Sequence, residues 1–129
     1  MYGLTVTVNM PFDAAVAKVT EELKKEGFGV LTDIDVKATL KAKIDVDRLP
    51  YRILGACNPV LANKAINMEP DIGLLLPCNV VVRQEADGKV SILLLDPNLM
   101  VQLVANKDVC EVATEARARL DRVKAALEA

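Results

Sequence analysis

One short segment constrains the fold more than any other. Two apolar runs, 80–83 and 90–95, are separated by a connection that contains Ala86, Asp87 and Gly88. An Asp-Gly pair between two apolar runs is a strong signal for a β-hairpin, so these runs are predicted to be neighbouring antiparallel strands. A hairpin within the sheet argues against a sheet wound only from alternating strands and crossover helices. We therefore expect a single α+β domain with a largely antiparallel sheet packed by helices.

The periodicity of apolar residues predicts the other elements. The segment 4–8 alternates apolar and polar residues, which is typical of a strand, and two further strands are predicted at 28–34 and 51–56. Apolar residues at helical spacing predict helices between the strands and a long C-terminal helix. The helices are expected to start at Pro11, after Asp35, at Asn58-Pro59 and, as a brief helix or turn, near Leu99, and the last one runs from about Asp108 to Leu127.

One face of each helix is expected to be buried. Gly27 is placed to end the first helix as a left-handed cap residue. The last helix carries a continuous apolar stripe that includes Val109, Leu120 and Leu127. In the two short middle helices the residues predicted to form the apolar face are Val36, Leu40 and Ile44, and then Leu61, Ala62, Ala65 and Ile66.

Length and composition indicate one domain with an aliphatic core. A chain of 129 residues has the usual size of a single domain, so residues 1–129 are treated as one. Hydrophobic residues make up 52% of the chain but aromatic residues only 3%, so Val, Leu, Ile and Ala must fill the core. The net charge of −2 argues against a nucleic-acid binder and against a protein of membrane surfaces, because both depend on clustered Lys and Arg.

The chain is expected to be cytoplasmic. No apolar run approaches a length of about 18–20 residues, which a membrane span needs. The first residues lack the charged and apolar regions of a signal peptide. Three cysteines at irregular spacing, in a chain without an export signal, favour reduced thiols in a cytosol.

Two segments carry a resemblance to a known family, GACNPVLA over 55–62 and LLPCNVVV over 75–82. Together with the Pro-Phe pair of the first helix and the Asp-Gly hairpin, they resemble the domain of unknown function family 302 over nearly the whole chain. The resemblance implies a compact α/β domain of TATA-box-binding-protein-like topology that tends to form homodimers. It implies no reaction and no DNA binding, because one fold hosts many functions.

The residue types that are missing exclude several classes of enzyme. The chain has no histidine, which removes the usual general base and the commonest metal ligand. Ser91 is its single serine and lies in a predicted strand, so a Ser-His-Asp hydrolase is excluded. No glycine-rich phosphate loop is present, and no Cys-x-x-Cys pair favours zinc. From the sequence we assign no metal site and no cofactor.

The cysteines are the residues best suited to chemistry. Cys57 immediately precedes Asn58-Pro59, and the N-terminus of a helix that starts there would stabilise a thiolate. Cys78 follows Pro77 at the start of a strand, so the two thiols approach each other if their segments are neighbours. They would then form a redox pair, carry sulfur, or bind a soft metal or haem; the alternative is that both are small buried hydrophobic residues. Cys110 is assigned to packing or to the surface.

Two further features also have alternative interpretations. Asn58 is expected to cap the helix that Pro59 begins, but it would also help to present backbone amides to an anion. The apolar segments 74–82 and 91–95 are either central strands or strands with one face against a second copy of the chain. A large hydrophobic ligand is the alternative occupant of such a face.

These observations favour a small homodimeric module that binds a ligand or a partner. The ligand is expected to be a small anionic or hydrophobic molecule near Cys57, Asn58, Pro59, Pro77 and Cys78. The alternative function is that of a thiol-dependent redox or sulfur-transfer protein, with Cys57 as the nucleophile and Cys78 as its resolving partner. The sequence supplies no base to activate the thiol, which counts against catalysis.

Overall fold

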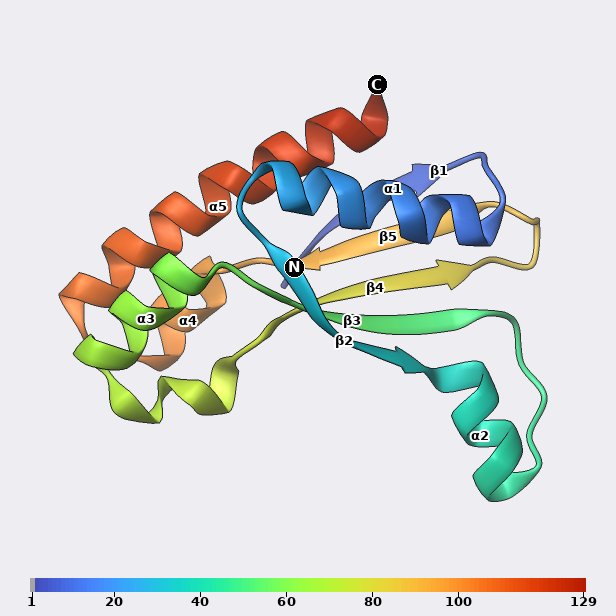
Figure 1. Ribbon diagram of the computed structural model, residues 1–129, viewed down its shortest axis with the longest axis horizontal. Coiled ribbons are helices and arrows are strands. Elements are labelled where there is room, and N and C mark those ends of the chain that lie inside the picture. Colours follow the sequence, from blue (N-terminus) through green and yellow to red (C-terminus); the bar gives the residue numbers. More distant parts are fainter. Residues whose placement is uncertain (1) are drawn as a thin grey trace.

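The computed structural model describes residues 2–129 and consists of a five-stranded sheet with a layer of helices (Figure 1). All neighbouring strands are antiparallel, in the order β1-β5-β4-β3-β2. The α+β fold predicted from the sequence is therefore confirmed. The strands are β1 (Gly3–Val8), β2 (Gly29–Asp35), β3 (Tyr51–Cys57), β4 (Cys78–Gln84) and β5 (Val90–Leu95).

The predicted hairpin joins β4 to β5 in the interior of the sheet. Gly88 in its turn has a φ of 89°, and the backbone N–H of Glu85 donates to the carbonyl of Lys89 at 2.8 Å. The register places Val82 opposite Ile92, and both side chains are fully buried. The runs 80–83 and 91–95 are thus central strands, as one of the two interpretations of the sequence predicted, but Leu74 and Leu75 of the segment 74–82 lie in a 3-10 helix (Pro70–Leu75) and not in a strand.

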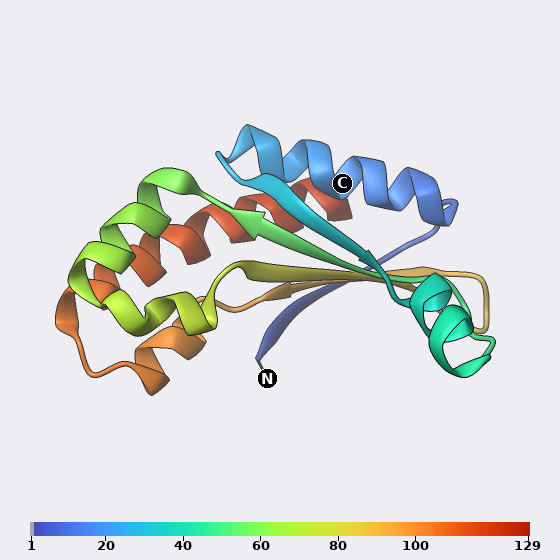
Figure 2. The same cartoon turned by 60° about the horizontal axis from the view of Figure 1, so that its bottom comes forward.

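Helices α1 and α5 lie side by side on one face of the sheet (Figures 1 and 2). The apolar stripe of α5 is buried along its length, which confirms the prediction from its spacing. Among residues 2–129, no helix has both the length and the apolar character needed to cross a membrane. The helices are α1 (Phe12–Lys25), α2 (Val36–Ile44), α3 (Pro59–Met68), the 3-10 helix η1 (Pro70–Leu75), α4 (Asn98–Leu103) and α5 (Lys107–Glu128).

Local capping signals act as predicted at both ends of β2. Gly27 follows the C-terminus of α1 with a φ of 83°, in the left-handed region that glycine adopts without strain. Asp35 starts α2, and its Oδ1 accepts a hydrogen bond from the N–H of Ala38 at 2.9 Å. These short-range interactions set where the two helices meet the sheet.

The predicted apolar faces of the two short helices are partly wrong. None of the residues of α2 is buried, and Ile44 is 62% exposed. The reason is that α2 follows β2 at the end of the sheet, away from α1 and α5 (Figure 1). In α3, Leu61 and Ala65 are buried but Ile66 is 43% exposed. Successive helical residues differ in direction by about 100°, so Ile66 points away from the face that packs on α5.

Within residues 2–129, no helix covers the face of the sheet opposite α1 and α5 (Figure 2). The register aligns Ile34, Ile53, Val81 and Leu93 across four neighbouring strands. Their neighbours in sequence point to the helical layer, so this row of four points to the open face. Three of the four side chains are half-buried and Ile34 is exposed. We call these four residues the open-face row.

Candidate functional site

The site is built where β3 ends and α3 begins. Asn58 is 7% exposed, and its Oδ1 accepts a hydrogen bond from the N–H of Leu61 at 3.2 Å. Pro59 occupies the first turn of α3, where its missing N–H costs no hydrogen bond. The predicted role of Asn58 as a helix cap is therefore confirmed. The cap orients Asn58 and fixes the direction in which the chain leaves Cys57.

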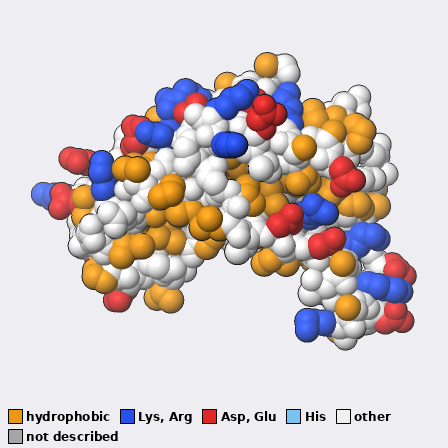
Figure 3. Space-filling model, viewed as in Figure 1, with side chains coloured by type: hydrophobic (Ala, Val, Ile, Leu, Met, Phe, Trp, Pro, Cys, Tyr) orange, Lys and Arg blue, Asp and Glu red, His pale blue; other side chains and the backbone are white. Residues whose placement is uncertain are grey.

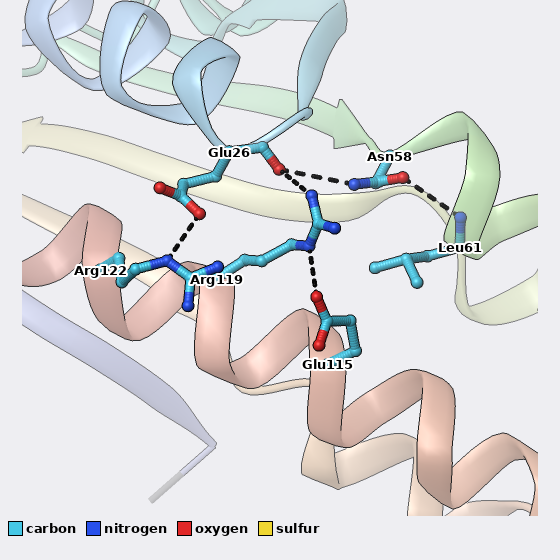
Figure 4. A network of polar contacts seen from close by, with 6 residues as sticks. All are labelled: Glu26, Asn58, Leu61, Glu115, Arg119 and Arg122. Atoms are coloured by element: carbon cyan, nitrogen blue, oxygen red, sulfur yellow. Dashed lines mark hydrogen bonds and ion pairs between the residues drawn. The ribbon is translucent and has the colours of Figure 1, made fainter.

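A polar network ties this helix start to the C-terminal end of α1 and to the middle of α5 (Figure 4). The backbone carbonyl of Glu26 accepts from Arg119 Nη1 at 2.9 Å and from Asn58 Nδ2 at 3.5 Å. The carboxylate of Glu26 accepts from Arg122 Nε at 2.8 Å, and Arg119 Nε donates to Glu115 at 2.8 Å. No sequence pattern predicted the pairing of Glu26 with Arg119, because they are 93 residues apart and no local pattern links them. The network joins α1, α3 and α5 at one edge of the site.

Adjacent strands bring Cys57 and Cys78 to the same small cavity. Ala56 pairs with Cys78 across β3 and β4, and Cys57 is the next residue of β3. The cavity has a volume of about 40 Å³ and an almost entirely apolar lining. We call it the sulfur cavity; its lining residues are Phe28, Ala56, Cys57, Asn58, Leu61, Ala62, Ala65, Leu76, Cys78, Pro97, Met100, Val112, Ala113 and Ala116.

The cysteines are free thiols in different surroundings. Cys78 is buried, and desolvation raises the pKa of its thiol from 9.0 to about 11, with a smaller contribution from the nearby Cys57. Its thiol is thus protonated at neutral pH. Cys57 is half-buried and so the more accessible of the pair. A reagent that enters from solvent would meet Cys57 first.

Helix α4 adds a third sulfur-bearing residue to the lining of this cavity, Met100. Met100 is buried, lines the sulfur cavity and packs in the same apolar cluster as Cys78. The sequence predicted only a brief apolar helix or turn there, and methionine is an ordinary core residue, so no signal pointed to it. Cys110 is half-buried on α5 and is not among the residues that line the cavity. Its Sγ lies 3.9 Å from the carbonyl oxygen of Asn106.

A larger groove lies beside the sulfur cavity, between η1 and α4. It consists of two hollows of about 230 and 340 Å³, which share Leu74, Leu75 and Leu103. Leu76 and Met100 line both the first hollow and the sulfur cavity. Figure 3 shows hydrophobic side chains gathered over this end of the molecule. We call it the leucine groove; its lining residues are Glu69, Asp71, Ile72, Leu74, Leu75, Leu76, Pro77, Asn79, Leu95, Leu99, Met100, Leu103, Val104 and Ala105.

The structure brings together four of the five predicted site residues. Cys57, Asn58 and Cys78 line the sulfur cavity, and Pro77 lines the leucine groove next to it. Pro59 is exposed and is not part of either lining, because its ring serves the first turn of α3. Within residues 2–129, no group of three or more His, Cys, Asp or Glu side chains is arranged to hold a metal ion.

Comparisons with known proteins identify relatives over the whole length of the domain. A family model described as "Domain of unknown function DUF302" matches residues 4–127. No curated protein matches the chain. A crystal structure of an uncharacterized conserved protein DUF302 from Bacillus stearothermophilus is 32% identical, and the match covers 98% of each chain with a TM-score of 0.89.

Proposed function

The chain belongs to the family of the domain of unknown function DUF302, and from its own geometry we propose that it is a binding module for an apolar ligand held in the leucine groove. The observation that carries this proposal is the exposure of leucine around the groove. Leu74 is 90% exposed and Leu103 62% exposed, and both line its hollows. Burying a leucine side chain stabilises a complex by about 1.5–3 kcal/mol. An apolar molecule in the groove would supply that burial.

The lining favours the hydrophobic over the anionic class of ligand predicted from the sequence. The described residues around the groove include Glu69 and Asp71 but neither lysine nor arginine. An anion would therefore meet negative charge without a cationic partner. The two hollows together have the size of an ordinary small-molecule site, about 300–1,000 Å³. A neutral molecule with an extended hydrocarbon part fits these surroundings best.

Binding of the neutral fluorescent probe N-phenyl-1-naphthylamine tests this proposal. Leu103→Asp places a charge in the groove and is expected to abolish most of the fluorescence gain. Val101→Asp is the matched control, because Val101 lies on the same helix and is 36% exposed but does not line the groove. Equal binding by the two variants, or no binding by the wild type, would exclude the groove as the site. Competition with a neutral long-chain alcohol and with the corresponding fatty acid then separates neutral from anionic ligands.

We also infer that the module is a homodimer that forms through the open-face row. Ile53, Val81 and Leu93 lie in neighbouring strands without a helix above them, and a symmetric dimer buries the same patch on both copies. Val81→Lys is expected to shift the sedimentation coefficient from dimer to monomer. Ala17→Lys is the control: it adds the same charge at an exposed position of α1, on the other side of the sheet, and should leave the dimer intact. A wild-type protein that sediments as a monomer, or a Val81→Lys dimer, would contradict this assembly.

Thiol exchange in the cytosol is the second candidate function, because Cys57 and Cys78 line one cavity. The Cys57 thiolate would attack a small-molecule disulfide, form a mixed disulfide with one half of it and release the other half as a thiol. The Cys78 thiolate would then attack Sγ of Cys57, form a Cys57–Cys78 disulfide and release the second half as a thiol. The two cysteines would end oxidised and the small disulfide reduced. Alkylation at increasing pH, mapped by mass spectrometry, tests this order. Thiol exchange predicts that Cys57 reacts first; if neither thiol reacts before unfolding, both are core residues.

A further inference from the structure

A second space borders the leucine groove at Leu99. It has a volume of about 320 Å³, and its lining consists of Tyr2, Asp96, Asn98, Leu99 and Gln102. We call this space the polar hollow, because four of its five lining residues are polar. Leu99 also lines the first hollow of the leucine groove. An apolar space and a polar space are therefore contiguous at this end of the molecule.

The spacing of residues in α4 explains why the two spaces adjoin. Side chains four residues apart lie on the same face of a helix. Leu99 and Leu103 are such a pair, and both line the leucine groove. Asn98 and Gln102 are the pair one position earlier, and both line the polar hollow. Helix α4 thus presents an apolar stripe and a polar stripe next to each other.

The part of the groove nearest to the polar hollow suits a hydrocarbon chain. This first hollow has a volume of about 230 Å³, and among the described residues no charged side chain lines it. Glu69 and Asp71 line only the second hollow, which shares no lining residue with the polar hollow. A chain that enters the groove from the polar hollow therefore lies first against leucine side chains.

The polar hollow suits a neutral head group that both donates and accepts hydrogen bonds. The amides of Asn98 and Gln102 and the phenol of Tyr2 offer donors and acceptors. The carboxylate of Asp96 is already engaged, because it accepts from Arg117 Nη1 at 2.7 Å and from the backbone N–H of Asn98 at 2.9 Å. Arg117 offsets the charge of Asp96, which weakens the attraction for a cationic head group. Within residues 2–129, no lysine or arginine lines the hollow to bind an anionic one.

We propose that the ligand of the leucine groove is a neutral single-chain amphiphile whose head group carries hydroxyl groups, as in a monoacylglycerol. The hydrocarbon chain lies in the groove and the head group in the polar hollow. A hydroxyl group donates to an amide oxygen and accepts from an amide N–H, so Asn98 and Gln102 recognise it without a charge. This inference rests on the proposed binding in the leucine groove and adds the recognition of the head group.

Displacement of N-phenyl-1-naphthylamine by two decanoate esters tests the head group. 1-Monodecanoylglycerol carries two hydroxyl groups, and 2,3-dimethoxypropyl decanoate is the same molecule with both of them methylated. The wild type is expected to bind the first ester about 10-fold more tightly, which is the effect of about one or two net hydrogen bonds. Gln102→Met and Asn98→Leu each remove an amide with little change in volume and should each lower this ratio by about 3-fold.

Asn63→Leu is the matched control, because Asn63 is an exposed amide on α3 and is not among the residues that line either space. It should keep the ratio of the wild type. Unchanged affinity of each variant for the dimethoxy ester shows that the groove is intact, and the comparison of ligands on the wild type does not depend on any variant.

The outcomes separate this inference from the proposed function. Equal affinities of the wild type for the two esters, or an unchanged ratio in both Gln102→Met and Asn98→Leu, would overturn the inference and leave the leucine groove as a binding site. Tighter binding of decanoate or of decylammonium than of the glycerol ester would also overturn it, because the head group would then be recognised by its charge. Failure of the wild type to bind any of these ligands would overturn both proposals.

Discussion

Replacing Gly27 by alanine is expected to destabilise the protein more than the same change at Gly88. Both glycines have a positive φ, 83° and 89°, so alanine is strained at both positions by about 1–2 kcal/mol. Their surroundings differ. A Cβ at Gly88 meets no atom within 4 Å, whereas a Cβ at Gly27 lies 2.9 Å from Asn58 Nδ2 and 3.2 Å from Arg119 Nη1. The new methyl group would push against both donors that share the Glu26 carbonyl.

The extra loss at Gly27 follows from those two hydrogen bonds. A typical hydrogen bond contributes about 0.5–1.5 kcal/mol to stability, and the Asn58 bond is long at 3.5 Å. Distortion of both bonds thus adds about 1–2 kcal/mol. The free energy of unfolding should fall by about 1–2 kcal/mol in Gly88→Ala and by about 2–4 kcal/mol in Gly27→Ala.

Urea denaturation followed by circular dichroism measures both free energies, and the m-value should stay constant. Arg119→Ala, made in the wild type and in Gly27→Ala, completes a double-mutant cycle. Its cost should be smaller in the Gly27→Ala background, because the Arg119 bond is already disturbed there. Equal losses at the two glycines, or strictly additive effects of Gly27→Ala and Arg119→Ala, would refute the reasoning.

Three other changes test the same structure. Asn58→Ala should lower the free energy of unfolding by about 1 kcal/mol, measured by urea denaturation, because the cap of α3 is lost; an unchanged midpoint would argue against the cap. Gly55→Ala should lower the free energy of unfolding by about 1–3 kcal/mol in the same urea experiment, because the new Cβ would overlap Thr32 Oγ1. Gly29→Ala is the control and should change this free energy little, because a Cβ there meets open space. The folded state holds the proton of Cys78 up to about pH 11, while the unfolded thiol loses it near pH 9.0, so the free energy of unfolding should fall as pH rises through this window. The loss should approach about 2–3 kcal/mol and disappear in Cys78→Ala; the same slope in both proteins would rule out Cys78 as its source.

Several parts of the candidate site could be predicted because short-range chemistry decides them. The cap at Asn58 needs only its side-chain oxygen and a free backbone N–H three residues later, and Pro59 fits the first turn that follows. The residue that follows the C-terminus of α1 has a left-handed backbone conformation, which favours glycine at position 27. Cys78 was expected at a strand start and lies there, as the first residue of β4. Each of these features depends on residues within one turn or one strand.

The sequence by itself determined the hairpin, the helix caps and the buried stripe of α5, since periodicity and capping act over a few positions. Only the tertiary structure decided which strands are neighbours, and so brought Cys57 to the cavity that Cys78 lines. It also placed Met100 there and joined Glu26 to Arg119 across 93 residues. The physical reason is that sheet order and packing minimise the exposed apolar area of the whole chain. The exposed apolar area of the whole chain cannot be read from any one segment. In the resulting packing, α2 and the open-face row have no covering layer of helices.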